Sequence, residues 1–257
     1  MLEAEGVTIA LGKAVSVSPG AGGAGHALAV SNGKTVEGDT LLLAVGRRPV
    51  TANLDLKRIG VELGPTGGIK VDAQLRTGAK GVCAAGDCTG DQQFTHYAGF
   101  QGGIAARNLL LPLTSDGTSS RVPGCTFTSP EVAHIGMTKK AAVAKLGGEN
   151  VRVVTRQLKN VDRAICAGTG GPGFYQIVTK AGSGEILGAT IMAPPAGELI
   201  GEIALAMHTK LKLPDLTLVM HAYPTYSMPL QVMASELYYE KLKKSAPLLA
   251  LLKRIGL

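Results

Sequence analysis

The second half of the chain is patterned as a set of strands followed by helices. Short apolar or alternating runs predict strands over 125–129, 132–137, 151–158, 174–181 and 185–193. Thr138 is a helix-capping residue and Gly147 a stop signal, so a helix is expected over 139–146. Helical spacing predicts a long helix over 196–211 and a last one over 228–244. The apolar face of the long helix consists of Leu199, Ile200, Ile203, Met207 and Leu211.

The first half begins with strand-like runs separated by glycine-rich turns. These strands are expected over 7–11, 15–18, 26–30 and 41–45. The segment 19–25 is rich in glycine, but it leads into no helix and has no acidic residue at the expected distance beyond it. It is therefore predicted to be a loop and not a phosphate-binding turn. A helix is expected over 94–110, with its apolar residues at Tyr97, Phe100, Ile104 and Leu109.

A Gly-Asp turn precedes that helix and is the main candidate site. A strand is expected over 82–85, which places Asp87 at its carboxyl end, where open α/β sheets bind ligands. Gly86 lets a ligand or another backbone approach closely. The following helix directs its amino end, with free N–H groups, toward the same place. A flavin nucleotide suits this arrangement, and so does an ordinary strand–turn–helix, so the residues alone leave both open.

Composition and charge limit the classes of protein to which this chain can belong. Glycine accounts for 35 of 257 residues, nearly twice the usual share of about 7%, and there is no Trp. The net charge of +7 comes from scattered basic residues without interleaved aromatics, which argues against nucleic-acid binding. No apolar run approaches the ~20 residues of a membrane span. These features favour a small-residue α/β protein that packs its backbone close to a cofactor.

The four cysteines predict neither a disulfide scaffold nor a metal site. Cys83 and Cys88 bracket the Gly-Asp turn, with Cys83 on the expected strand, and both are interpreted as packing residues. Cys125 and Cys166 stand in strand-like contexts and lack metal-ligand spacing. No zinc site is therefore expected.

The residues around the turn resemble a known motif. Ala84-Ala-Gly-Asp87, then Gln93-Phe-Thr-His96 and an Ala/Gly-rich helix, resemble the second flavin-binding motif of the pyridine nucleotide-disulfide oxidoreductases. That family includes glutathione reductase, dihydrolipoamide dehydrogenase and mercuric reductase. The resemblance implies that Asp87 hydrogen-bonds with the ribityl chain of FAD. It also implies that backbone N–H groups near Thr95 face the pyrimidine end of the flavin. The implied cofactor-binding residues are Gly86, Asp87, Gln93, Phe94, Thr95 and His96.

The same resemblance implies a domain layout. The segment 44–49, Ala-Val-Gly-Arg-Arg-Pro, is similar to the family's Ala-Thr-Gly-Arg-x-Pro signature but carries Val45 in place of threonine. The polar linker 114–120 indicates a second boundary. Residues 1–47 are then a remnant of an α/β NAD(P)-binding domain and 48–120 part of the FAD-binding domain. Residues 121–257 are an α+β interface domain with an antiparallel sheet, which in the family forms the homodimer.

The segment 221–228, His-Ala-Tyr-Pro-Thr-Tyr-Ser-Met, departs from the family pattern. The disulfide reductases place a His before Pro-Thr and a Glu five positions after that His, and the pair exchanges a proton with the substrate thiol. Here Tyr223 and Met228 occupy those positions. His221 lies two residues before Tyr223, and this His-x-Tyr-Pro-Thr arrangement resembles that of mercuric-reductase-like members. His221 has two interpretations: a substitute acid/base, or a residue that caps or packs the loop. Tyr223 is a second catalytic candidate, with its hydroxyl lining a substrate pocket.

The resemblance implies the carboxyl half of a homodimeric FAD-dependent NAD(P)H oxidoreductase. Reduced flavin would pass electrons to a disulfide or another small acceptor. The glycine fingerprints for FAD and NAD(P) and the redox-disulfide helix are absent from this sequence, and no cysteine follows Cys166. The alternative hypothesis is therefore a catalytically inactive dimerisation module or pseudoenzyme remnant.

Overall fold

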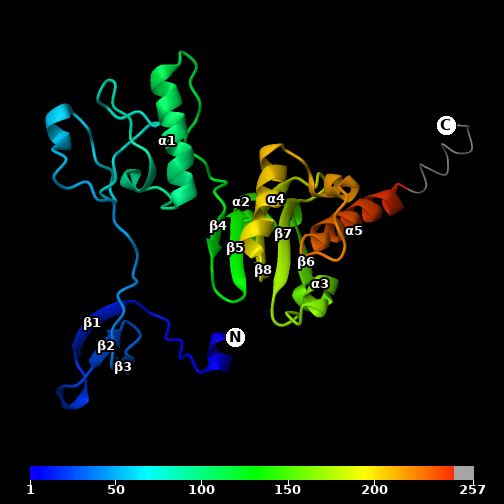
Figure 1. The fold of residues 1–257 in the computed structure, drawn as a ribbon, viewed down its shortest axis with the longest axis horizontal. Helices are drawn as coiled ribbons and strands as arrows, with labels where there is room; N and C mark the ends of the chain where they lie inside the picture. The colour runs from blue at the N-terminus through cyan, green and yellow to red at the C-terminus, as the bar shows by residue number, and fades with distance from the viewer. Residues whose placement is uncertain (246–257) are drawn as a thin grey trace, which may run out of the picture. The chain divides into compact units, whose positions relative to one another are not determined.

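The computed structural model describes residues 1–245, which form two compact units. The first runs from Met1 to Arg48, and the second begins at Pro49 (Figure 1). The second unit contains an irregular segment with one long helix and a five-stranded sheet covered by helices. The candidate sites of the turn and of the segment 221–228 both lie in this second unit.

The first unit contains a three-stranded antiparallel sheet in the order β1-β2-β3. Its strands are β1 (Ala14–Pro19), β2 (His26–Val30) and β3 (Thr35–Gly38). The strands expected over 15–18 and 26–30 are confirmed, whereas 7–11 and 41–45 form no strand. β3 carries little hydrophobic alternation and was not expected. It forms because a tight turn with Gly33 at φ +83° folds it back onto β2.

The irregular segment of the second unit carries two short 3₁₀ helices, η3 (Leu56–Ile59) and η4 (Gly86–Thr89), and the α-helix α1 (Thr95–Leu110). The strand expected over 82–85 is absent, because the chain there pairs only through a single bridge between Arg76 and Cys83. A small apolar cluster of Val61, Ile69 and Ala84 supports the segment instead. The turn is therefore held by loops and by α1, and no sheet edge takes part.

The five-stranded sheet is antiparallel throughout, in the order β4-β5-β8-β7-β6. All five strands expected in this region are present, each within a few residues of its predicted bounds. They are β4 (Gly124–Thr126), β5 (Glu131–Gly136), β6 (Val151–Gln157), β7 (Phe174–Lys180) and β8 (Ile186–Ala193).

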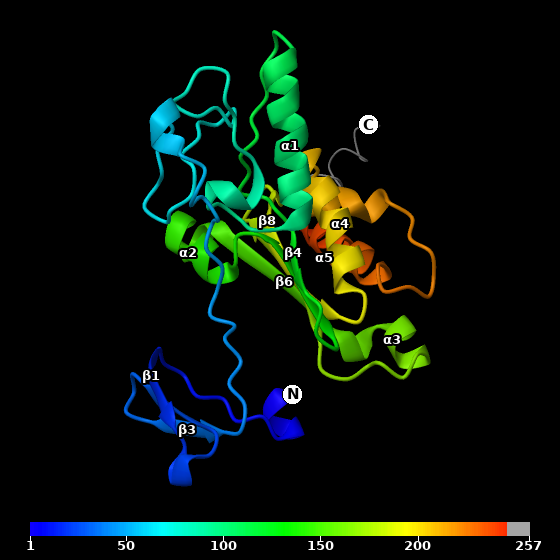
Figure 2. The same ribbon diagram turned by 60° about the vertical axis from the view of Figure 1, so that its left-hand side comes forward.

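Helices cover both faces of this sheet. α2 (Lys139–Leu146) lies on one face, and α4 (Ala196–His208) and α5 (Met228–Lys244) lie on the other (Figure 2). This part of the chain also contains α3 (Asp162–Cys166) and the 3₁₀ helix η7 (Leu213–Leu218). The α2 prediction is confirmed together with its cap, since the Thr138 hydroxyl accepts a hydrogen bond from the Ala141 N–H at 3.2 Å.

The main core lies between the sheet and α4, α5 and η7. Four of the five residues of the apolar face predicted for the long helix are buried there: Leu199, Ile200, Ile203 and Met207. Leu211 is 40% exposed, because α4 ends at His208 and the chain turns away. Burial of each of these side chains stabilises the packing of α4 on the sheet by about 1.5–3 kcal/mol.

Tyr175 makes the stability of this core pH-dependent. Its side chain is fully buried, and its hydroxyl donates to the Tyr226 carbonyl at 2.9 Å. Burial, with a contribution from Tyr226, raises the pKa of Tyr175 above the ordinary value of 10.0. The unfolded chain therefore ionises first as the pH rises. We expect the free energy of unfolding to fall above about pH 10, because only the unfolded state gains the phenolate.

Urea unfolding at about pH 8 and about pH 11 measures this loss. Tyr175→Phe should reduce the alkaline loss, since it removes the ionising group from both states. Tyr238→Phe, at an exposed position on α5, is the matched control and should leave the loss unchanged. Equal alkaline losses in the wild type and Tyr175→Phe would contradict the assignment.

Among residues 1–245, no helix is long and apolar enough to cross a bilayer.

Candidate functional site

The Gly-Asp turn packs directly against α1. Gly86 has φ +77°, and a Cβ atom at this position would lie 2.8 Å from the Cβ of Ala98. A side chain here would therefore meet both an unfavourable backbone conformation and the first turn of the helix. Glycine is required for this close approach, which places the turn beside the amino end of α1.

Gln101 fixes the turn to the helix, and sequence reasoning missed it. This side chain is 1% exposed. Its Oε1 accepts the Gly86 N–H at 2.7 Å, and its Nε2 donates to the Gly117 carbonyl at 3.2 Å. One glutamine thus satisfies two backbone groups from separate loops. The sequence signal that could have identified Gln101 is a polar residue among the inward-facing positions of a predicted helix.

The buried face of α1 is more polar than predicted. Phe100 and Leu109 are about half exposed, which contradicts the predicted apolar face, and the buried positions include Tyr97 and Asn108. The Asn108 amide bonds with three backbone groups of the neighbouring loops, and the Tyr97 hydroxyl donates to Asp91 at 3.0 Å. Burial raises the pKa of Tyr97. α1 is anchored by hydrogen bonds because loops, with their unpaired backbone groups, surround it.

The end of α1 next to the turn offers groups to a ligand. Asp87 is exposed, and among residues 1–245 no donor is bonded to its carboxylate. Phe94 occupies the N-cap position, and no described side chain caps the helix. Thr95 is exposed in the first turn, and Gln93 is half-buried just before it. A free carboxylate thus lies near a helix end that favours negative charge.

Phe94 and His96 brace this helix end against the following sheet. Their rings stack with centroids 5.2 Å apart. His96 Nε2 donates to the Pro123 carbonyl at 2.8 Å, and a Cβ at Gly124 would lie 3.0 Å from the Phe94 ring. The two side chains therefore position the helix end within the chain. All six residues of the predicted flavin motif lie between the turn and this first helical turn.

The cysteines are all free. Cys88 packs against the small apolar cluster, and its thiol is 3.3 Å from the Ala85 carbonyl. Cys125 lies on β4 as expected, whereas Cys166 ends the short helix α3 and is exposed, so the strand-like context predicted for it is wrong. Among the described residues, no group of three or more His, Cys, Asp or Glu side chains is arranged to hold a metal ion.

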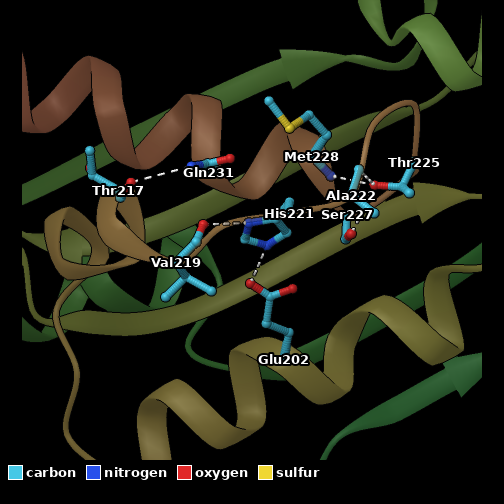
Figure 3. Close-up of polar contacts among 9 residues, drawn as sticks. All are labelled: Glu202, Thr217, Val219, His221, Ala222, Thr225, Ser227, Met228 and Gln231. Carbon is cyan, nitrogen blue, oxygen red and sulfur yellow. Dashed lines mark hydrogen bonds and ion pairs between the residues drawn. The ribbon is translucent and has the colours of Figure 1, made fainter.

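The loop between η7 and α5 brings His221 to a carboxylate that sequence spacing did not reveal. Its Nε2 lies 2.8 Å from Oε1 of Glu202 on α4, and its Nδ1 lies 2.9 Å from the Val219 carbonyl oxygen (Figure 3). The His221 side chain is only 5% exposed. Both ring nitrogens are thus engaged inside the protein, which favours the interpretation that His221 packs the loop.

Tyr223 is the exposed member of the same loop. Its side chain is 68% exposed, and its hydroxyl donates to Asp162 Oδ2 at 2.9 Å. The hydrogen bond to Asp162, together with the charge of that carboxylate, raises the pKa of Tyr223. The phenol borders a hollow of about 90 Å³, which Arg156, Arg163 and Thr225 also line. The hydroxyl is therefore kept protonated and is accessible from outside the chain.

Two models of one known family together match most of this chain. Residues 1–102 match the pyridine nucleotide-disulfide oxidoreductase family, and residues 122–234 match the dimerisation domain of that family. The first match contains the Gly-Asp turn and the start of α1. The second contains the sheet, α4 and the loop with His221 and Tyr223.

Individual relatives agree with these matches. Mercuric reductase of Bacillus cereus is 36% identical over 78% of this chain and 32% of that protein. Dihydrolipoyl dehydrogenase of Chlamydia muridarum is 37% identical over 76% of this chain and 41% of that protein. NAD(P)H dehydrogenase (quinone) of Mycobacterium tuberculosis is 34% identical over 80% of this chain and 41% of that protein. The chain thus matches only 32–41% of the length of these relatives.

Solved structures share the fold. LpdA from Mycobacterium tuberculosis superposes with a TM-score of 0.77 at 33% identity, covering 88% of this chain and 48% of that one. The HOCl-induced flavoprotein disulfide reductase RclA from Escherichia coli superposes with a TM-score of 0.80 at 26% identity. That superposition covers 91% of this chain and 53% of RclA.

Proposed function

Because this chain belongs to the pyridine nucleotide-disulfide oxidoreductase family, we propose that it forms the carboxyl half of a homodimeric FAD-dependent NAD(P)H oxidoreductase. The family is one of flavoenzymes that use FAD and NAD(P)H. Held by Asp87 and the amino end of α1, FAD would supply hydride and electron transfer from NAD(P)H to a small acceptor such as a disulfide.

The observation that carries this proposal is the unpartnered carboxylate of Asp87 beside the uncapped end of α1. The described residues fit a flavin nucleotide: the close packing of Gly86 on α1 keeps the turn free of a side chain. Asp87 is exposed and able to accept hydrogen bonds from sugar-type hydroxyls. The N–H groups around Thr95 suit an electron-rich ring edge. Phe94 and His96 hold that helix end in place, and Gln93 directly precedes it.

The homodimer is proposed from the surface around the Tyr223 loop. Several large apolar side chains of the second unit are exposed there and on neighbouring elements: Phe127, Leu205, Leu218 and Met220. Exposed apolar side chains on this scale are typical of an interface. Tyr223, whose hydroxyl donates to Asp162, would be presented to the active site of the second subunit, where its hydroxyl oxygen is able to accept a hydrogen bond. His221 enters this proposal as a residue that positions the loop.

The alternative is that the chain dimerises without catalysing a reaction. The observation in its favour is that the positions that hold the family's His and Glu are occupied by Tyr223 and Met228. Proton exchange with a thiol by that pair is then unavailable. Under this alternative the translated product binds no flavin.

Flavin content tests the proposal directly. We expect the full-length protein that contains this chain to be yellow and to lose that colour when NADH or NADPH is added. It should sediment as a dimer. Asp87→Ala should lower the bound FAD per chain at least several-fold, because a hydrogen bond from a ligand hydroxyl to a carboxylate contributes about 1.5–3 kcal/mol. The measurement is the visible spectrum together with FAD released from denatured protein.

Asp39→Ala provides the matched control, since Asp39 is an exposed carboxylate in the first unit. It should leave the flavin content unchanged. A colourless dimeric product would support the alternative. Unchanged FAD in Asp87→Ala, with the protein yellow, would remove Asp87 from the proposed site.

A further inference from the structure

The hollow beside Tyr223 is lined by two arginines. It has a volume of about 90 Å³, and residues of β6, α3, the segment 221–228 and the first turn of α5 contribute to its lining. Arg156 comes from β6 and Arg163 from α3. The apolar part of the lining consists of Val161, Met228, Pro229 and Val232. A small apolar patch with a few polar groups around it is the usual make-up of a site for a small ligand.

The guanidinium group of Arg163 has no partner within the described chain. Among residues 1–245, no hydrogen bond or ion pair involves its side chain. The backbone that carries it is well anchored, because the neighbouring Val161 and Ala164 are 3% and 0% exposed. The five N–H donors of Arg163 therefore extend from a fixed point of the hollow and are available to a ligand.

The guanidinium group of Arg156 is oriented by the chain but keeps free donors. Its Nη2 donates to the Asn160 carbonyl at 3.1 Å. Its Nη1 lies 3.7 Å from Oε1 of Glu236, which is too long for a hydrogen bond. The Arg156 side chain is 30% exposed, so it lies partly inside the protein. Arg156 is thus held in one orientation while its Nη1 hydrogens lack an acceptor in the chain.

The two hydroxyl groups of the lining use their hydrogens within the chain. The Tyr223 hydroxyl donates to Oδ2 of Asp162 at 2.9 Å. The Thr225 hydroxyl donates to the Ala222 carbonyl at 2.7 Å (Figure 3). The side-chain donors left to a ligand are therefore the two guanidinium groups and the amide of Asn160.

The charge of the lining favours an anion. Among the lining residues that the structure describes, Asp162 is the one carboxylate, and two arginines outweigh it. The first turn of α5 also borders the hollow, and the positive end of the helix dipole adds to this excess. A negatively charged group is consequently stabilised here more than a neutral polar group of the same size.

We propose that this hollow binds a small oxyanion, a carboxylate or a phosphate group, through the guanidinium groups of Arg156 and Arg163. The planar fork of N–H donors in a guanidinium group matches the oxygens of both anions. A volume of about 90 Å³ has room for several water molecules and so admits one such group. The bound anion lies beside the ring of Tyr223. The site goes beyond the proposed function, since anion binding by these residues needs neither flavin nor a second subunit.

The ring signal of Tyr223 reports on occupancy, because the ring lines the hollow. The full chain is prepared with ¹³C-labelled tyrosine, and the Tyr223 signal is assigned by its loss in Tyr223→Phe. Sodium phosphate and sodium acetate are added separately at about pH 7, where both anions are charged, and sodium chloride keeps the ionic strength constant. We expect the signal to move and to saturate at roughly millimolar concentrations of at least one anion. A response to phosphate alone, acetate alone or both assigns a phosphate group, a carboxylate or their shared chemistry.

Arg163→Gln should weaken binding of the responding anion at least about tenfold, because it removes charge-assisted hydrogen bonds. Arg107→Gln is the matched control, since it makes the same change of charge at an exposed position on α1. It should bind the anion as the wild type does. A wild-type signal that responds to neither anion would overturn the proposal. So would equal binding by Arg163→Gln and the wild type, or an equal loss of binding in both variants.

Flavin content, measured separately on the full-length protein, distinguishes failure of this site from failure of the proposed function. A colourless protein whose Tyr223 signal responds to phosphate or acetate would contradict only the proposed function. A yellow protein whose signal responds to neither would contradict only the oxyanion site.

Discussion

Replacing Gly86 with alanine is expected to destabilise the second unit by about 3 kcal/mol. About 1 kcal/mol comes from placing a side chain at φ +77°. The remainder comes from overpacking, since the new Cβ would lie 2.8 Å from the Cβ of Ala98, and neither α1 nor the turn can shift without breaking hydrogen bonds. Urea unfolding followed by circular dichroism measures the free energy of unfolding.

Gly81→Ala separates the two contributions. Gly81 has the same φ of +77°, but a Cβ there would meet nothing within 4 Å. It should therefore cost only the backbone term of about 1 kcal/mol. If both variants lose equal stability, the close approach between the turn and α1 contributes nothing, and glycine is not required at position 86.

Replacing Gln101 with methionine is expected to cost about 2–4 kcal/mol. Methionine matches the length of glutamine and suits a helix, so the variant removes hydrogen bonds with little change of shape. The Gly86 N–H and the Gly117 carbonyl then lose their partner in a region where Gln101 is 1% exposed. Each buried backbone group left without a partner costs about 1–3 kcal/mol. The free energy of unfolding in urea is again the measurement.

Gln157→Met controls for the change of side chain. Gln157 ends β6 and is exposed, so its replacement should alter stability by no more than about 0.5 kcal/mol. A Gln101→Met variant as stable as this control would show that Gln101 does not hold the turn. Under the proposed function, Gln101→Met should also lower FAD content, because the turn carries Asp87.

Much of the second unit could be predicted because its signals are local. Thr138 and Gly147 delimit α2 through a cap and a stop that each act within one turn. The strands of the five-stranded sheet alternate or run apolar over lengths that strands require. By contrast, β3 depends on pairing with β2, and the absence of a strand over 82–85 depends on having no neighbour to pair with.

The candidate sites likewise contain some residues that the sequence revealed and others that only the structure revealed. Gly86 and Asp87 stand out from sequence because a turn before a helix has a recognisable composition. Glu202 does not, because it lies nineteen residues before His221 on a helix whose other face dominates the pattern. The departure from the family's His and Glu positions was visible in sequence, but the carboxylate that His221 meets instead was not.

The sequence by itself determined which segments become helices and strands in the second unit, and which residues resemble a flavin-binding turn. Those properties depend on propensity, capping and periodicity, which act over a few residues. The tertiary structure alone decided that polar side chains anchor α1 and that His221 meets Glu202. These contacts join segments far apart in the chain, and only the packing of helices on loops and on the sheet brings them within hydrogen-bonding distance.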